Sequence, residues 1–321
     1  MEQLRTNPDA LTGGAVAAKA FVPTSREELL LRAVGVRAGL SRCLLCERRC
    51  GADRREGTSH AGDAVRAPCG LGESTHCFKR HVSFGEEAEL LPSYMVYFAG
   101  CNFRCAFCVQ APECFDPGRG PLVETNELAK ECKEAVGHGA RTINLLGGEP
   151  SLHLHTFLEL AAAGLSSRDE PLPLVLNSNF YMTAEVIDLL EGVVTLYLAD
   201  FKFGTEACAK SIAGVDRYWE VVTRNLLHAR DQCERTGARM LVRHLVMPGH
   251  VECCTRPVVA WMRERMPEVR FHVMDGYVPA WRAQNHPMLG RLLNAEESTA
   301  VAELRVSAPR RGTHVAFGGV A

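Results

Sequence analysis

Six short apolar runs alternate with segments of helical pattern, and this alternation constrains the fold of the 321-residue chain more than any other feature. The runs are YMVYFAG (94–100), RTINLLGG (141–148), LPLVLNSN (172–179), VVTLYLAD (193–200), RMLVRHLVMPG (239–249) and VRFHVMDG (269–276). Helix formers, or apolar residues three or four positions apart, fill 125–136, 155–165, 183–190, 217–235 and 252–266. Strands that alternate with helices form parallel units with right-handed crossovers. The sequence therefore predicts an α/β fold, a partial (β/α)6 barrel short of the eight units of a complete one.

The remainder of the chain divides around this barrel. We expect an irregular N-terminus at 1–25, a helix and a small cysteine-rich metal-binding segment at 26–90, the barrel at 91–304 and a tail at 305–321. A net charge of −2 gives no general attraction to nucleic acid, which we regard as an unlikely partner. No apolar run reaches the ~18 residues of a membrane span and no secretory pattern opens the chain, so we expect a cytoplasmic protein without a membrane partner.

Fourteen cysteines are many for a chain of this kind, and they are bunched. Disulfide frameworks are typical of small secreted domains, which this chain does not resemble. Reduced thiols that bind metal are the better interpretation. The densest group lies in AGCNFRCAFC (99–108), directly after the first predicted strand, and contains Cys101, Cys105 and Cys108.

Three thiols on one loop suit an iron–sulfur cluster with one open position. Four thiolates close a [4Fe–4S] cube, so three leave one iron free to bind something else. Catalytic metal sites keep such an open position, whereas structural ones do not. The alternatives are a share of a zinc site completed elsewhere, or buried free cysteines.

Polar or glycine-rich residues follow each of the other predicted strands. They are GGEP (147–150), NSN (177–179), Asp200 with Lys202, Arg243 with His244, and Asp275 with Tyr277. Parallel strands place their carboxyl ends on one rim of a barrel, where active sites of such folds lie. We therefore expect these residues to converge on the cysteine loop.

The spacing C-x3-C-x2-C after a first strand, an aromatic residue before the third cysteine, and GGEP after the second strand together resemble the radical S-adenosylmethionine (SAM) superfamily. ADFKFG and VRHLVMPG are similar to the pyruvate formate-lyase activating enzyme group. The start CLLCERRC, followed by HVSFGEEAELLPSYMVYFAGCNFRCAFC, resembles a branch of that group with an N-terminal cysteine motif. The resemblance covers roughly residues 40–280.

The resemblance implies a redox enzyme. Cys101, Cys105 and Cys108 would hold a [4Fe–4S] cluster whose fourth iron binds SAM. Reductive cleavage of SAM would give a 5′-deoxyadenosyl radical that abstracts hydrogen from a protein, peptide or small molecule, with activation of a glycyl-radical enzyme as one case. A low-potential donor such as flavodoxin or ferredoxin would supply the electron.

The same resemblance assigns the cofactor contacts. Gly147 and Gly148 would let backbone approach the ligand, and Glu149 or the carbonyls beside it would accept from the methionine ammonium. Lys202 would meet the methionine carboxylate. Asn177 and Asp200 would shape a polar or cation site, although Asn177 stands where an acidic residue is usual. Arg243 would contact the ligand carboxylate or substrate, with a structural ion pair as the alternative.

The N-terminal cysteines form a second group. Cys43, Cys46, Cys50 and Cys69 supply four thiols, enough for a structural zinc site or an auxiliary iron–sulfur cluster, and Cys77 is an alternative fourth ligand. The remaining cysteines lack spacing partners, and we interpret them as buried small hydrophobes: Cys114, Cys132, Cys208, Cys233, Cys253 and Cys254. A non-catalytic, metal-stabilised binding protein on the same fold is the alternative to the enzyme.

Overall fold

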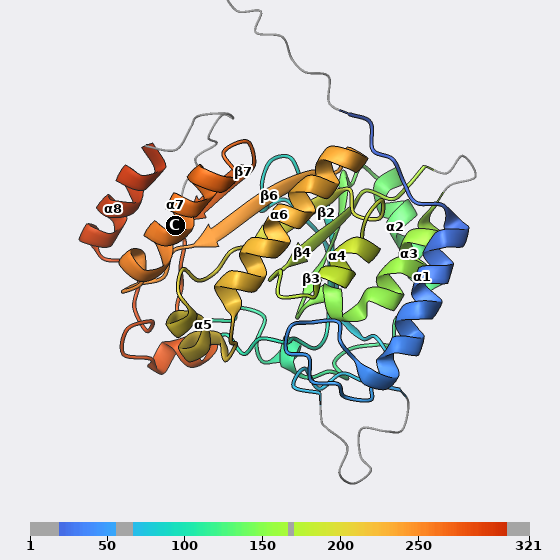
Figure 1. The fold of residues 1–321 in the computed structure, drawn as a ribbon, viewed down its shortest axis with the longest axis horizontal. Coiled ribbons are helices and arrows are strands. Elements are labelled where there is room, and N and C mark those ends of the chain that lie inside the picture. Colours follow the sequence, from blue (N-terminus) through green and yellow to red (C-terminus); the bar gives the residue numbers. More distant parts are fainter. Residues whose placement is uncertain (1–18, 56–66, 166–169, 307–321) are drawn as a thin grey trace, which may run out of the picture.

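A seven-stranded sheet with helices along one face forms the core of the computed structural model, which describes residues 19–55, 67–165 and 170–306 (Figure 1). The strands follow one another in sequence order, from β1 to β7. Strands β2 to β7 are parallel, and β1 runs antiparallel to β2 at the edge. The predicted partial (β/α)6 barrel is confirmed, with one extra strand.

Six of the strands lie where the apolar runs predicted them. The bounds are β1 Cys77–Ser83, β2 Ser93–Phe98, β3 Thr142–Gly147, β4 Leu174–Ser178, β5 Leu196–Asp200, β6 Arg239–Leu245 and β7 Arg270–Met274. The sequence did not predict β1, because its run CFKRHVS is mostly polar and its residues are half-buried or exposed after Cys77.

The helices follow the strands as the alternation requires. They are α1 Arg26–Gly39, α2 Thr125–Gly137, α3 Leu154–Gly164, α4 Ala184–Leu189, α5 Glu206–Ala213, α6 Tyr218–Thr236, α7 Arg256–Arg265 and α8 Ala295–Val306. The sequence missed α5 and α8. The predicted helix at 252–266 begins as a π-helical turn, Val251–Thr255, and becomes α7 only at Arg256.

The two faces of the sheet are covered differently. Tyr197 and Ala199 of β5 belong to the main core under the helices, whereas Leu196 and Leu198 point to the opposite face, inside the barrel. There they pack with Leu90, whose side chain is fully buried. Leu90 belongs to the β1–β2 connection, and its carbonyl accepts from the Thr142 hydroxyl at the start of β3, so Leu90 occupies the barrel interior at the amino ends of the parallel strands. The opposite, carboxyl-end rim is the one that remains for ligands.

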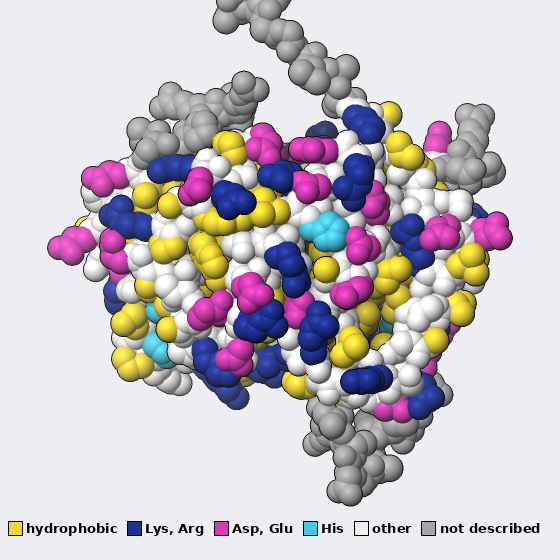
Figure 2. Space-filling model, viewed as in Figure 1, with side chains coloured by type: hydrophobic (Ala, Val, Ile, Leu, Met, Phe, Trp, Pro, Cys, Tyr) yellow, Lys and Arg dark blue, Asp and Glu magenta, His cyan; other side chains and the backbone are white. Residues whose placement is uncertain are grey.

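The outer surface mixes charges of both signs. Figure 2 shows basic and acidic side chains interspersed over the helix-covered face, with no broad field of one sign. None of the helices in the described ranges is long and apolar enough to cross a membrane. The division of the chain into domains stays a prediction, and residues 1–18 and 307–321 of its two ends lie outside the described part.

Candidate functional site

The cysteine loop follows β2 and is held by backbone hydrogen bonds from distant parts of the chain. The amides of Arg104 and Ala106 donate to the last carbonyls of α5, at 3.0 and 2.9 Å, and the amide of Ala283 donates to the carbonyl of Ala106 at 2.8 Å. Phe107 also packs against Phe203 and Tyr277. The loop is therefore fixed by α5 and by the segment that follows β7.

The three thiols lie together in this loop and are little exposed. Cys101 and Cys105 each keep 8% of their surface accessible, and Cys108 is half-buried. Burial raises the pKa of Cys101, with smaller contributions from the neighbouring thiols, and raises that of Cys105 to about 12. A hydrogen bond with the Cys114 thiol, 3.5 Å away, lowers the pKa of Cys108 to about 7. The three sulfurs are close enough to influence one another.

The glycines after β3 lie against the cysteine loop. A Cβ on Gly148 would come within 1.8 Å of the carbonyl oxygen of Gly100, and one on Gly147 within 2.5 Å of backbone atoms of Phe98. Gly147 also adopts φ +111°, a conformation that side chains rarely allow. These glycines bring two strand ends into contact, and their predicted approach to a ligand stays a prediction.

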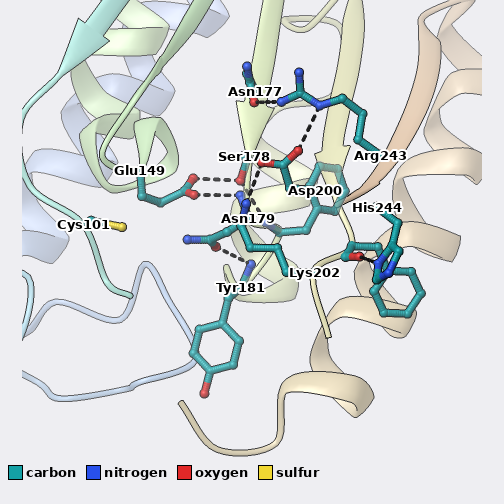
Figure 3. Close-up of polar contacts among 12 residues, drawn as sticks. Cys101, Glu149, Asn177, Ser178, Asn179, Tyr181, Asp200, Lys202, Arg243 and His244 are labelled. Atoms are coloured by element: carbon teal, nitrogen blue, oxygen red, sulfur yellow. Dashed lines mark hydrogen bonds and ion pairs between the residues drawn. The ribbon is translucent and has the colours of Figure 1, made fainter. Parts of the chain in front are cut away.

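Glu149 is buried and its carboxylate already accepts three hydrogen bonds (Figure 3). The donors are the Ser178 hydroxyl at 2.7 Å and the backbone amides of Asn179 and Ser151 at 2.9 and 3.1 Å. Burial raises the pKa of Glu149 against the effect of these donors. The carboxylate thus ties the end of β3 to the end of β4.

Asp200, Lys202 and Arg243 form one ion-pair network on the inner face of the barrel, as Figure 3 shows. Lys202 Nζ lies 2.7 Å from Asp200 Oδ2, and Arg243 Nε lies 3.0 Å from Asp200 Oδ1. Arg243 also donates to Asn177 Oδ1 at 2.8 Å. Burial alone would raise the pKa of Asp200, but the two cations lower it to about 2.

Lys202 connects this network to the thiols. Its ammonium lowers the pKa of Cys105 and Cys108, and the carboxylate of Asp200 together with Cys105 raises the pKa of Lys202 against its burial. A half-buried cation beside a thiol group is suited to an anionic ligand. Asn177, Asp200 and Arg243, from β4, β5 and β6, thus form one network that Lys202 joins to the cysteine loop. His244 does not converge there: its ring nitrogens contact the Phe201 carbonyl and the Thr255 hydroxyl.

Two acidic residues that the sequence analysis missed complete the network. Glu86 and Glu87, from the β1–β2 connection, lie 3.3 and 3.8 Å from Arg243 Nη1. Both residues lie in the sequence SFGEEAEL, but they can be assigned to the site only when the connection is known to fold into the barrel. Arg243 therefore makes ion pairs with Asp200 and Glu86, and its predicted contact with the ligand carboxylate or substrate stays a prediction.

The N-terminal thiols line a cavity of about 10 Å³ beside the cysteine loop. Its walls include Cys43, Cys46, Cys50, Cys69 and Asn102, the residue directly after Cys101. Burial raises the pKa of Cys46 to about 12, with contributions from the thiols of Cys69 and Cys43. The structure brings the four predicted ligands together. Cys77 instead lies at the start of β1, where its thiol donates to the carbonyl of Lys79.

A fully buried arginine faces the same cavity. Arg54 donates to the carbonyls of Gly72 and Leu152 at 3.0 Å, and its Nη1 lies 3.6 Å from the sulfur of Cys43. No carboxylate is among the partners that the described residues offer it. A buried cation requires an anionic partner, and metal-bound thiolates would supply one.

Comparison with protein-family models identifies the superfamily of this chain. The model of the radical SAM superfamily matches residues 95–262, slightly more than half of the chain. The chain belongs to the radical SAM superfamily. It is therefore a radical SAM enzyme by family, and the resemblance seen in its sequence is confirmed at this level; the activating-enzyme subgroup stays a prediction.

Relatives extend the match beyond the family model. An uncharacterized protein of Methanocaldococcus jannaschii is 34% identical over 268 residues, which are 82% of this chain and 73% of the relative. A GTP 3′,8-cyclase of Aliarcobacter butzleri is 24% identical over 219 residues, 62% of this chain and 64% of that enzyme. Among solved structures, SuiB of Streptococcus suis, bound to the precursor peptide SuiA, is similar at 13% identity and a TM-score of 0.48 over 64% of this chain and 44% of its own.

The radical SAM cofactors are a [4Fe–4S] cluster and SAM, and the residues present fit them. Three neighbouring thiols on one loop offer three cluster ligands and leave one iron for the amino and carboxylate groups of SAM. Gly148 and Gly100 remove side chains from the rim beside the loop. Lys202 supplies a positive charge next to the thiols.

Proposed function

We propose that Cys101, Cys105 and Cys108 hold the catalytic [4Fe–4S] cluster and that the chain acts as a reductive SAM-cleaving oxidoreductase. When bound, the reduced cluster supplies one electron to SAM, which splits into methionine and a 5′-deoxyadenosyl radical that takes a hydrogen atom from the substrate. The observation that carries the proposal is the three-thiol loop at the carboxyl end of β2, packed against the glycines at the end of β3.

The protein's own groups would position SAM around that loop. The backbone carbonyls of Gly147 and Gly148 would accept from the methionine ammonium, because the carboxylate of Glu149 is already engaged with Ser178 and Asn179. Lys202 would exchange part of its contact with Asp200 for the methionine carboxylate. Asp200 would keep its partner Arg243 during this exchange and so remain ionised.

Cofactor cleavage tests the assignment. The protein is reconstituted anaerobically with iron and sulfide, mixed with SAM and dithionite, and 5′-deoxyadenosine is quantified. We expect product from the wild type and from Cys233→Ala, a half-buried thiol of α6, and none from Cys105→Ala. Equal product from Cys105→Ala and the wild type would refute the ligand assignment.

The substrate would enter from the carboxyl-end rim, since Leu90, from the β1–β2 connection, occupies the other end of the barrel. A protein or peptide, including a glycyl-radical enzyme, is our first candidate, on the likeness of ADFKFG and VRHLVMPG to the activating enzymes. A small molecule is the second, because the chain also aligns with GTP 3′,8-cyclases. Hydrogen transfer from a deuterated candidate into 5′-deoxyadenosine would distinguish the two.

The remaining partners follow from the chemistry. The cluster requires a low-potential one-electron donor, for which flavodoxin and ferredoxin are the candidates. All fourteen cysteines are free thiols in the structure, which suits a reducing compartment, and we propose the cytoplasm. Assays of cluster reduction with each donor would identify the effective one.

We further propose that the N-terminal thiols hold an auxiliary iron–sulfur cluster rather than zinc. Ligand sulfurs of a tetrahedral zinc site lie roughly 3.8 Å apart, as Zn–S bonds of about 2.3 Å require. Among the described residues, Cys43, Cys46, Cys50 and Cys69 do not form a group of three whose sulfurs all lie within 4.8 Å of one another. The sulfurs of Cys101, Cys105 and Cys108 likewise do not all lie within 4.8 Å of one another. Asn102, which directly follows Cys101, lines the cavity of the N-terminal thiols, so the two thiol groups are neighbours.

Iron content tests the auxiliary site. The reconstituted wild type should contain about eight irons, and Cys46→Ala about four, if each cluster is a [4Fe–4S] cube. Zinc in the wild type that disappears from Cys46→Ala, with iron unchanged at about four, would refute this assignment in favour of a structural zinc site.

A further inference from the structure

One group of cysteine and histidine side chains lies outside both thiol sites. It consists of Cys208, His250, Cys253 and Cys254, whose ligand atoms all lie within 4.8 Å of one another. Cys208 Sγ lies 3.5 Å from His250 Nδ1 and 3.5 Å from Cys253 Sγ, and His250 Nδ1 lies 3.2 Å from Cys253 Sγ. The sequence analysis treated these cysteines as unrelated buried hydrophobes.

These distances match the ligand spacing of a single tetrahedral ion. With Zn–S bonds of about 2.3 Å and Zn–N bonds of about 2.0–2.1 Å, neighbouring ligand atoms lie roughly 3.5–3.8 Å apart. The group is more compact than either of the other two thiol groups, because neither of those contains three sulfurs that all lie within 4.8 Å of one another. We propose that Cys208, His250, Cys253 and Cys254 bind one structural zinc ion.

Two neighbouring loops build the site. Cys208 lies in the first turn of α5, where the Thr205 hydroxyl accepts from its backbone amide, and α5 follows β5. The other three residues follow β6, whose end lies close to the start of α7 in Figure 1. Because β5 and β6 are adjacent parallel strands, the two loops meet at the same rim.

The π-helical turn explains how consecutive cysteines face one point. Val251–Thr255 departs from α-helical geometry before α7 begins, and such turns are uncommon and frequent at functional sites. A Cβ on Gly204 would come within 2.6 Å of the backbone of Cys253 and Cys254, so the turn packs closely against the loop between β5 and α5. The backbone amide of Gly204 hydrogen-bonds the Cys254 sulfur, as amides commonly do with metal-bound thiolates.

The chemistry of the donors favours zinc. Thiolate and imidazole ligands are those zinc prefers, and three cysteines with one histidine complete a closed, four-coordinate structural site. Binding would release three thiol protons to solvent and leave a charge of −1 on the complex. No position is left open, so the ion would have no catalytic role.

The zinc site would stabilise the cysteine loop indirectly. Its ion would fix the amino end of α5 to the turn after β6, and the carboxyl end of α5 accepts the two hydrogen bonds from Arg104 and Ala106. We therefore expect loss of zinc to loosen the cysteine loop without removing any of its thiols.

Metal analysis of the full-length protein tests the proposal. The chain is produced with zinc present, purified anaerobically without chelators, and assayed for zinc and iron by mass spectrometry. We expect about one zinc in the wild type and in Cys233→Ser, and none in Cys208→Ser or Cys253→Ser. Zinc retained in Cys208→Ser, iron in place of zinc, or a metal-free group with a Cys208–Cys253 disulfide would each overturn the assignment.

A measurement on the wild type covers the case in which the variants fail to fold. X-ray absorption at the zinc edge should show three sulfur neighbours at about 2.3 Å and one nitrogen at about 2.0–2.1 Å. Four sulfur neighbours would place the zinc at the N-terminal thiols and refute the proposal. The result is independent of the proposed activity, because zinc content does not depend on SAM cleavage.

Discussion

Replacing Gly148 by alanine should disturb the cysteine loop more than a methyl group added at any other glycine of this rim. The new carbon would lie 1.8 Å from the Gly100 carbonyl oxygen, and contacts below 3.0 Å essentially do not occur, so the backbone at Gly148 and at Gly100 must move apart. The neighbours are backbone atoms rather than flexible side chains. The same movement stretches the 2.9 Å hydrogen bond from the Glu149 amide to Gly100.

The free energy of unfolding should fall by roughly 2–4 kcal/mol. Overpacking costs about 1–3 kcal/mol and the weakened hydrogen bond about 0.5–1.5 kcal/mol. Urea unfolding of the apoprotein measures the loss, and iron content after reconstitution measures its effect on the cysteine loop. Gly137→Ala is the matched control, because nothing lies within 4 Å of its new methyl group. Wild-type stability and iron content in Gly148→Ala would refute the packing argument.

Three further predictions concern buried charges. The pKa of Asp200 is lowered from 3.8 to about 2, so its carboxylate contributes stability that is fully present above pH 3.8 and is lost as the pH falls through 2. When the free energy of unfolding is measured in urea, the wild type should lose about 2 kcal/mol more than Asp200→Asn between pH 5 and pH 2. Arg243→Met should lower the free energy of unfolding by about 3–5 kcal/mol, because it removes the ion-pair partner of the largely buried Glu86 and one of the two partners of Asp200. Arg270→Met at the exposed edge should cost at most about 1 kcal/mol, and similar losses in the two variants would contradict the burial argument. Arg54→Met should reduce the iron content at the N-terminal thiols, and the control Arg55→Met should not; iron analysis of both variants measures this. Unchanged iron in Arg54→Met would mean that the buried cation does not stabilise this site.

The strands and the cysteine loop were predictable because their signals are local. Val96 and Phe98 of β2 lie in an apolar run, and the three thiols that follow occupy eight residues. The parallel order of the strands then brought Asp200 and Arg243 to the same rim, where they pair in register across β5 and β6.

What the sequence did not predict depends on contacts between distant segments. Cys208 and His250 are 42 residues apart, so no spacing motif connects them, and only the meeting of the loops after β5 and β6 does. Glu87 reaches Arg243 because the β1–β2 connection turns into the barrel. The edge strand β1 has too few apolar residues to be distinguished from a loop.

The support of the cysteine loop by late parts of the chain has a consequence for biosynthesis. The loop ends at Cys108, yet Ala106 needs the carbonyl of Ile212 and accepts from the amide of Ala283. A ribosome that adds about 5–20 residues per second requires roughly 9–35 s to pass from residue 108 to residue 283. During that time the thiols emerge without their final neighbours. The cysteine loop therefore gains its final backbone partners only after the whole barrel has been translated.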